Sequence, residues 1–347
     1  MSPTLELSSR KVAALKYLVT GAAGFIGSNL SARLAISGND VVGVDNFSPY
    51  YSPKLKELRV SEFLTPYGID VKRVDLSDIS EVEKIVRDFK PDVIIHLAAQ
   101  PGVRTPLGKS YQYIQNNLVA FANVLQTAIE ESVPEILYAS SSSVYGNSIQ
   151  TTYKEDDLSI RPISIYGATK LSNEILTPVF IKGSKTRARG MRFFTVYGPW
   201  GRPDMAYFRI IDSILNGTEF KKFGGGEIKR DFTYVDDITA TIEKLSTELF
   251  ARPVGFSDIV NIGGGNPHSL NELIEAISKQ LGSTPLISES ISNPNDVSFT
   301  CSDVSKLNEL IGSVPVINLE SGAKETIAWA QRDGIKEHLV EWINSTY

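Results

Sequence analysis

The segment 21–27 (GAAGFIG) joins a short apolar run at 16–20 to a predicted helix at 28–37, and it constrains the fold more than any other part of the chain. The apolar run is typical of a buried strand, and glycines after a strand let the backbone approach a pyrophosphate at the N-terminus of a helix. A second apolar run at 41–44 ends at Asp45, at the distance where an acid can accept a hydrogen bond from an adenosine ribose. A glycine turn alone fits a tight strand–helix connection equally well. The strand, the helix and Asp45 together favour a dinucleotide site, and the Asp45 charge, which would repel a 2′-phosphate, favours NAD over NADP.

The same alternation of strands and helices continues along the chain. Apolar runs at 69–74, 91–97 and 135–139 predict strands, and the segments 80–89 and 111–130 predict helices between them. Such alternation predicts an α/β fold with a doubly wound parallel sheet of the Rossmann type, followed by a smaller C-terminal substrate-binding α/β domain. The C-terminal ends of the strands then line one edge of the sheet, where ligands bind. Five residues are expected at that edge: Gly21, Asp45, Asp75, Ala98 and Ser141.

The rhythm changes near residue 198, where a loop rich in Gly, Pro and Arg precedes a predicted helix at 206–216 and a glycine run at 224–226. We therefore predict an NAD-binding domain at 1–195, to which the chain returns at about 234–262. The substrate-binding domain is predicted from 196–233 and 263–347. Within the returning segment, Asp236 and Asp237 are interpreted as a helix start, because acids are favoured near the positive end of the helix dipole.

Tyr166 and Lys170 stand four residues apart, so on a helix their side chains share a face. An ammonium beside a phenol favours the phenolate, and we expect Lys170 and a cationic cofactor together to lower the pKa of Tyr166 and make it an acid/base. A serine cluster at 140–143 precedes the pair and supplies hydroxyls. The pair alone occurs by chance in many amphipathic helices, but downstream of a dinucleotide loop it predicts a hydride-transfer site.

Bulk properties exclude several classes of protein. A formal net charge of −5 argues against a broad nucleic-acid or anionic-membrane surface, and no run approaches the ~20 apolar residues that span a bilayer. Cys301 is the only cysteine and there are three histidines, so we expect no disulfide within the chain and no metal site. His96 is interpreted as a packed residue. The expected protein is soluble and cytoplasmic.

The chain resembles the extended short-chain dehydrogenases/reductases, NAD-dependent sugar epimerases among them, and is most similar to the UDP-glucuronate 4-epimerases. The general family is matched by the glycine loop, 96–99 (HLAA), Asn117, the serine cluster, Tyr166 with Lys170, and 230–235 (RDFTYV). The narrower group is suggested by 45–51 (DNFSPYY), 99–104 (AQPGVR) and above all 192–206 (RFFTVYGPWGRPDMA). These motifs cover nearly the whole chain.

The resemblance implies a role for each site residue. Tyr166 would take the proton of the sugar 4-hydroxyl, Ser141 would hydrogen-bond the same oxygen, and Lys170 would hold the nicotinamide ribose. The catalytic residues are thus Tyr166, Lys170 and Ser141. The NAD-binding residues are Gly21, Gly24, Phe25, Ile26, Gly27, Asp45, Asn46, Asp75, Leu76, Leu97, Ala98, Ala99, Ser140, Tyr166 and Lys170. The substrate-binding residues are Arg104, Ser141, Ser142, Ser143, Thr195, Arg202, Arg230 and Asp296.

Some of these roles stay open or depart from the family. Arg202 is favoured for the hexuronate carboxylate and Arg230 for the UDP phosphates, whereas Ser142 and Ser143 either donate to the carboxylate or cap the turn. Asp296 follows Asn295 where relatives usually have glycine, and Pro101 stands where related epimerases often have alanine. Asn117 is expected to brace the active-site helix, and Pro178 is expected to kink that helix or end it early.

The resemblance implies 4-epimerisation of UDP-glucuronate to UDP-galacturonate through a 4-keto sugar, in a homodimer formed by the helices around 111–130 and 164–180. The first alternative is a UDP-glucose or UDP-N-acetylglucosamine 4-epimerase. A UDP-glucuronate decarboxylase or a sugar 4,6-dehydratase is disfavoured, because those relatives carry acids in the segment where this chain has serines. An NAD-binding protein without activity is disfavoured by the intact Ser141, Tyr166 and Lys170. A serine hydrolase lacks its Gly-x-Ser-x-Gly elbow here.

Overall fold

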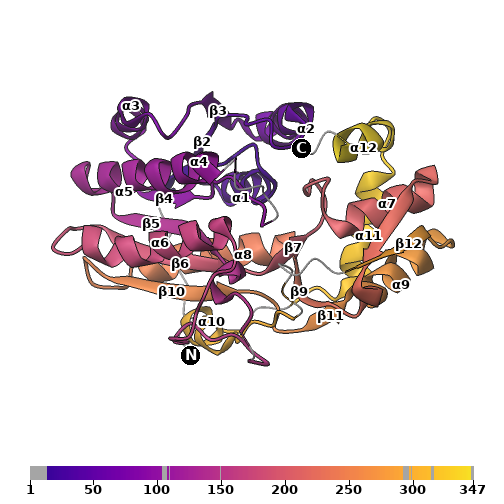
Figure 1. The fold of residues 1–347 in the computed structure, drawn as a ribbon. Coiled ribbons are helices and arrows are strands. Elements are labelled where there is room, and N and C mark those ends of the chain that lie inside the picture. Colours follow the sequence, from indigo (N-terminus) through magenta and orange to yellow (C-terminus); the bar gives the residue numbers. More distant parts are fainter. Residues whose placement is uncertain are drawn as a thin grey trace, which may run out of the picture.

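The structure is a computed structural model, and it describes residues 14–103, 108, 110–148, 150–291, 297, 299–313 and 316–344. Within these ranges, no helix is long and apolar enough to cross a membrane. Figure 1 shows a large sheet with helices on both faces and a second group of elements, including α7, α9, α11 and α12, gathered on the right.

The large sheet has seven strands, all paired in parallel, in the order β10-β6-β5-β4-β1-β2-β3. The order runs outward from β1 in both directions, which is the doubly wound topology predicted from the sequence. A ligand crevice forms where the order reverses, here between β1 and β4. The strands are β1 (Lys16–Thr20), β2 (Asp40–Asp45), β3 (Asp70–Arg73), β4 (Val93–His96), β5 (Glu135–Ser141), β6 (Arg187–Phe193) and β10 (Ser257–Ile262).

Alternate side chains of the buried strands fill two separate cores, one on each face of the sheet. Tyr17 and Val19 of β1 pack in one core, and Leu18 between them packs in the other. The first core is closed by α1 (Phe25–Ile36), α8 (Val235–Leu249) and α10 (Ser305–Ile311). The second is covered by α3 (Ile79–Phe89) and α5 (Ala120–Glu130), with α6 (Ile165–Phe180) packed beside α5.

Three helices differ in detail from the sequence prediction. Helix α1 begins at Phe25 rather than at residue 28, so the last glycine of the loop, Gly27, already lies inside the helix. The predicted helix 111–130 is divided into α4 (Ser110–Ile114), a π-helical turn (Gln115–Val119) and α5. Helix α6 runs through Pro178 and ends two residues later at Phe180.

The elements after β6 build a smaller lobe around an aromatic core that includes Trp200, Tyr207 and Trp329. The predicted helix at 206–216 is confirmed as α7 (Ala206–Asn216). The other elements are β7 (Thr195–Tyr197), β8 (Glu219–Phe223), β9 (Lys229–Tyr234), β11 (Pro267–Ser269), β12 (Leu286–Ser290), α9 (Leu270–Leu281), α11 (Leu319–Ala330) and α12 (Ile335–Asn344). Helix α2 (Pro53–Leu58), a π-helical segment (Arg59–Leu64) and a short 3₁₀ turn (Thr65–Tyr67) come earlier in the chain, and Leu55 of α2 also packs in this core.

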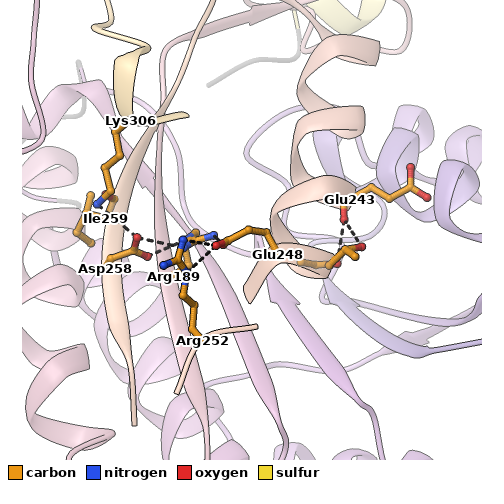
Figure 2. Close-up of polar contacts among 9 residues, drawn as sticks. Arg189, Glu243, Glu248, Arg252, Asp258, Ile259 and Lys306 are labelled. Carbon is orange, nitrogen blue, oxygen red and sulfur yellow. Dashed lines mark hydrogen bonds and ion pairs between the residues drawn. The ribbon is translucent and has the colours of Figure 1, made fainter. Parts of the chain in front are cut away.

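After β9 of the small lobe, the chain returns to the large sheet with α8 and β10. Helix α8 packs on α1, and β10 pairs with β6 at the edge of the sheet. The buried Arg189 of β6 binds Asp258 of β10 and Glu248 of α8, as Figure 2 shows. Leu307 of α10 also packs in the core of the large sheet, although the sequence places it in the substrate-binding segment 263–347. The domain boundaries themselves remain a prediction.

Candidate active site

A cavity of about 910 Å³ lies at the C-terminal edge of the large sheet and extends toward the small lobe. Arg104 and Asp296 lie outside the described residues. Every other site residue predicted from the sequence lines this cavity. They are Gly21, Gly24, Phe25, Ile26, Gly27, Asp45, Asn46, Asp75, Leu76, Leu97, Ala98, Ala99, Ser140, Ser141, Ser142, Ser143, Tyr166, Lys170, Thr195, Arg202 and Arg230.

The glycine loop is packed too closely for a Cβ at all three of its glycines, Gly21, Gly24 and Gly27. Gly21 has a φ of +71°, and a Cβ on it would lie 2.8 Å from the backbone nitrogen of Ala98. A Cβ on Gly27 would lie 2.1 Å from the carbonyl oxygen of Gly21. Gly24 precedes the first turn of α1 and no side chain caps the helix there, so its first N–H groups can bind an anion in the cavity.

Asp45 at the end of β2 is buried and engaged on both oxygens. It accepts hydrogen bonds from the backbone nitrogens of Ala23 (3.2 Å) and Phe47 (2.7 Å). Its third partner, the buried Lys56 of α2, has its Nζ 3.3 Å away and lines the same cavity. The sequence interpretation missed Lys56, which places a positive charge beside the acid expected to repel a 2′-phosphate. The sequence between Asp45 and Lys56 does not reveal this partner, because the contact depends on how α2 folds back.

Tyr166 and Lys170 lie on α6, whose first turn is capped by Ser164. The Lys170 Nζ donates to the carbonyl oxygen of Ala139 at 2.8 Å and lies 5.9 Å from the centre of the Tyr166 ring. Tyr166 also makes a hydrogen bond with Ser141, the last residue of β5. The structure therefore brings the three predicted catalytic residues together.

The pKa values of Tyr166 and Lys170 are both shifted by burial. Burial raises the pKa of Tyr166, and the Ser141 hydrogen bond and the Arg202 charge, which both lower it, do not compensate. Burial also lowers the pKa of Lys170 to about 8, against the opposing effect of Glu174. In the protein alone, burial therefore outweighs the groups that lower the Tyr166 pKa, and the expected lowering by Lys170 together with a cationic cofactor stays a prediction.

The serine cluster is divided between two tasks. The Ser141 hydroxyl accepts a bond from the backbone nitrogen of Ser143 and donates to the Ser143 hydroxyl, both at 3.1 Å, so it caps the 3₁₀ turn Ser142–Tyr145. Ser140, predicted to bind the cofactor, lines the cavity and donates its hydroxyl to the buried carboxylate of Glu174. Ser142 and Ser143 line the cavity and are half-buried.

The cavity lining also contains an ion pair, Arg202 with Asp204, that the sequence interpretation missed. Arg202 donates to Asp204 from Nε at 3.0 Å and from Nη2 at 2.5 Å. Burial raises the pKa of Asp204, but Arg202 outweighs it and the net pKa is lowered, so Asp204 is an anion at neutral pH. The spacing in 202–204 (RPD) could have suggested the pair. Thr195, at the start of β7, lines the same cavity.

Two expectations about residues beside the site are met by the structure. His96 is buried, bonds to the Thr20 hydroxyl at 2.9 Å, and has its pKa lowered to about 3 by burial and by the Lys170 charge, so it is a neutral packed residue. Asn117 in the π-helical turn bonds to both backbone groups of Gln100 and to the Thr169 hydroxyl of α6, as expected for a residue that braces this helix.

Among the described residues, no group of three or more His, Cys, Asp or Glu could hold a metal ion.

The chain is similar to known proteins over most of its length. The profile of the NAD dependent epimerase/dehydratase family matches residues 17–263. A probable UDP-glucuronate 4-epimerase of Rhizobium meliloti (strain 1021) is 35% identical over 339 residues, which cover 93% of this chain and 99% of the relative. A UDP-glucuronate 4-epimerase of Thermodesulfobacterium geofontis (strain OPF15) is 35% identical over 320 residues, with 91% and 96% covered. The solved UDP-glucuronic acid 4-epimerase from Bacillus cereus, in complex with UDP-glucuronic acid and NAD, is 34% identical with a TM-score of 0.83, and the match covers 93% of this chain and 99% of that one.

Proposed function

The chain belongs to the NAD dependent epimerase/dehydratase family, and we propose that it is an NAD-dependent UDP-glucuronate 4-epimerase. The observation that carries the proposal is the cavity itself, which joins a glycine loop, the Ser141–Tyr166–Lys170 group and the partly buried Arg202 in one space. A guanidinium there suits a substrate that carries a carboxylate. The large-sheet segments 1–195 and 234–262 would hold NAD, and the segments 196–233 and 263–347 would hold the UDP-sugar.

The residues present fit the cofactor, because the tightly packed glycine loop leads to the uncapped N-terminus of α1 at the cavity and Asp45 stands at the ribose position. When bound, NAD accepts a hydride from the sugar and returns it. The glycine loop would bind the pyrophosphate, and Lys170 would hold the nicotinamide ribose.

Tyr166 performs the acid/base step in this proposal. As the phenolate, which the positive charge of bound NAD would favour together with the Lys170 ammonium, it takes the proton of the 4-hydroxyl as C4 is oxidised, while Ser141 donates a hydrogen bond to the same oxygen. The 4-keto sugar then turns its other face to the cofactor, and Tyr166 gives the proton back. The reaction is balanced, since each turnover removes and restores one hydride and one proton.

The carboxylate of the substrate must be held still during this turn. A C4 ketone lies β to the C6 carboxylate, and a β-keto acid loses carbon dioxide when the breaking bond aligns with the carbonyl π system. Arg202, Thr195, Ser142 and Ser143 would fix the carboxylate out of that alignment. Asp204 is ionised by its pairing with Arg202, so it has no proton to give to an enolate.

Incubation with UDP-glucuronate and NAD, followed by chromatography and mass spectrometry of the nucleotide sugars, tests the proposal. We expect UDP-galacturonate with little UDP-pentose. A neutral UDP-hexose as the only sugar turned over would favour the first alternative, a UDP-glucose or UDP-N-acetylglucosamine 4-epimerase. Pentose as the main product would replace the proposal with a decarboxylase.

We also propose a homodimer formed through α4 and α6. The two helices are neighbours, and they expose Tyr111 and Ile114 on α4 together with Ile175 and Val179 on α6. Large apolar side chains at such exposure are costly in water and are typical of a surface covered by a second copy. The double variant Ile175→Asp, Val179→Asp should be a monomer by light scattering, whereas Leu158→Asp, an exposed apolar site elsewhere, should leave the dimer intact.

A further inference from the structure

Glu174 lies one helical turn beyond Lys170 on α6, and none of the roles described above uses it. Its side chain is 5% exposed and does not line the cavity. It accepts two hydrogen bonds from Arg192 of β6, from Nε at 2.9 Å and from Nη2 at 2.8 Å. It also accepts a hydrogen bond from the hydroxyl of Ser140, the residue before Ser141. Glu174 therefore joins α6 to two strands directly behind the catalytic residues.

The network continues across the sheet. The Nη1 of Arg192 donates to the Tyr145 hydroxyl at 2.8 Å, and that hydroxyl donates to the Asn261 side chain of β10 at 2.8 Å. All four side chains are nearly or completely buried. Buried charges are costly unless they are paired, so such a network is maintained only where every member has its partners. The network fixes α6 against β5, β6 and β10.

We propose that Glu174 is a positioning residue for hydride transfer, which holds α6 at the register that places Tyr166 and Lys170 beside Ser141. The proposal rests on the proposed function, since it concerns the same site. Two contacts from α6 to the end of β5 carry it. Lys170 donates to Ala139, Ser140 donates to Glu174, and Ser141 is the next residue of that strand.

The charges around Lys170 decide its protonation. Glu174 and Tyr166 lie near it on α6 and His96 on β4, and Arg192 of β6 binds Glu174. His96 is neutral, and the phenol of Tyr166 is neutral while its pKa stays raised. Burial lowers the pKa of Lys170 to about 8, and the charge of Glu174 opposes this effect. Without that charge, less of Lys170 would be an ammonium at neutral pH.

The protein contains a matched control at the opposite face of the same strand. Arg189, three residues before Arg192 on β6, binds Glu248 of α8 at 2.5 Å and Asp258 at 2.7 Å (Figure 2). This pair has the same chemistry, a buried guanidinium on β6 with a carboxylate on a covering helix. It lies away from the cavity, because neither residue lines it.

The experiment compares Glu174→Gln with Glu248→Gln in the full-length protein. The first measurement follows the ε-carbon NMR signal of Lys170 against pH, with ¹³C-lysine labelling and assignment by Lys170→Met. It needs no turnover, so it stands even if the proposed substrate is wrong. The second measures kcat and KM with UDP-glucuronate and NAD.

In Glu174→Gln, we expect the Lys170 midpoint to fall by about one pH unit. We expect kcat to fall by about 10- to 100-fold with KM changed less than about twofold, because the reacting groups are displaced and not the substrate contacts. Glu248→Gln should leave the Lys170 midpoint unchanged and kcat within about twofold of wild type. Equal effects of the two substitutions on both measurements would overturn the proposal.

Glu174→Asp keeps the charge and withdraws the carboxylate from Ser140, and it decides the outcome if Glu174→Gln does not fold. We expect it to keep the Lys170 midpoint and to lose about tenfold in kcat. Wild-type kcat in this variant would rule out the positioning role.

Discussion

Arg202 presents Nε and Nη2 to the two oxygens of Asp204, so the guanidinium that lines the cavity is already paired with a carboxylate of the protein. The pair is partly buried, with side chains 24% and 11% exposed. A hexuronate carboxylate therefore meets an arginine whose orientation is fixed and whose charge is partly balanced. Two donors of Arg202 hold Asp204, which leaves Nη1 to reach a substrate.

We predict that Arg202→Ala impairs UDP-glucuronate far more than UDP-glucose. Loss of a hydrogen bond to a charged group costs about 1.5 to 3 kcal/mol, or roughly 10- to 150-fold in kcat/KM. Arg209→Ala is the control, because Arg209 lines the same cavity from α7 but is exposed. Steady-state kinetics with both sugars gives the ratio. Equal losses for the two sugars would assign Arg202 to the pyrophosphate or to the structure.

Tyr166→Phe should lower turnover by about 100- to 10,000-fold, because it removes the proton acceptor and keeps the ring. Bound NAD should stay at the wild-type level, since the phenol is only one of many contacts in the cavity. Turnover is measured by product formation, and NAD by the nucleotide released with acid. A variant with wild-type turnover would show that Ser141 or water performs the proton transfer.

Asp45→Asn should weaken the discrimination between NAD and NADP. The substitution removes the charge that repels a 2′-phosphate and leaves the Lys56 ammonium, now 3.3 Å from the acid, without an anion. Lys56→Met should change discrimination in the opposite direction. Titration of each protein with both nucleotides by calorimetry measures this. An unchanged preference in Asp45→Asn would remove the role given to Asp45.

Glu135→Gln should stabilise the protein at pH 8. Both carboxylate oxygens of Glu135 are buried without a hydrogen-bond partner in the described part of the chain, and burial raises its pKa to about 9. An unfolded glutamate has a pKa of about 4.3, so between these values the folded state holds a proton that the unfolded state lacks. The free energy of unfolding contributed by this group therefore falls as the pH rises through that window.

Urea unfolding of the wild type and the variant at pH 4.5 and pH 8 tests this prediction. The gain of Glu135→Gln should be larger at pH 8 and should shrink toward pH 4.5. Glu130→Gln, an exposed position on α5, should show no such trend. A gain independent of pH would mean that Glu135 is ionised in the folded protein.

The parts of the fold that follow from local pattern could be predicted from the sequence. Strand β1, the glycine loop and Asp45 all lie within residues 16–45, and they follow one another in the strand–turn–helix–strand order of a dinucleotide site. The helix at 206–216 was predicted at its bounds because apolar residues recur there with helical spacing. Parallel strands with covering helices have one favoured topology, which places the strand ends at one edge.

The parts that depend on contacts between distant segments could not be predicted. Asp45 meets Lys56 only because α2 folds back over the end of β2. The Tyr166 pKa depends on burial, which the spacing of Tyr166 and Lys170 does not contain. The π-helical turn at Gln115–Val119 carries Asn117, which contacts Gln100 and Thr169 in other segments, and its sequence looks like ordinary helix.

The position of β10 at the edge of the sheet has a consequence for the synthesis of the chain. Until residues 257–262 have been made, β6 has no neighbour on its outer side, and an unpaired strand with buried residues is a template for aggregation. Arg189 also lacks its ion-pair partners when β6 emerges, because Glu248 and Asp258 both come later in the chain. The large sheet therefore cannot gain its last strand, β10, until most of the protein has been synthesised. A chain truncated before β10 would leave β6 as an exposed edge strand and Arg189 without Asp258.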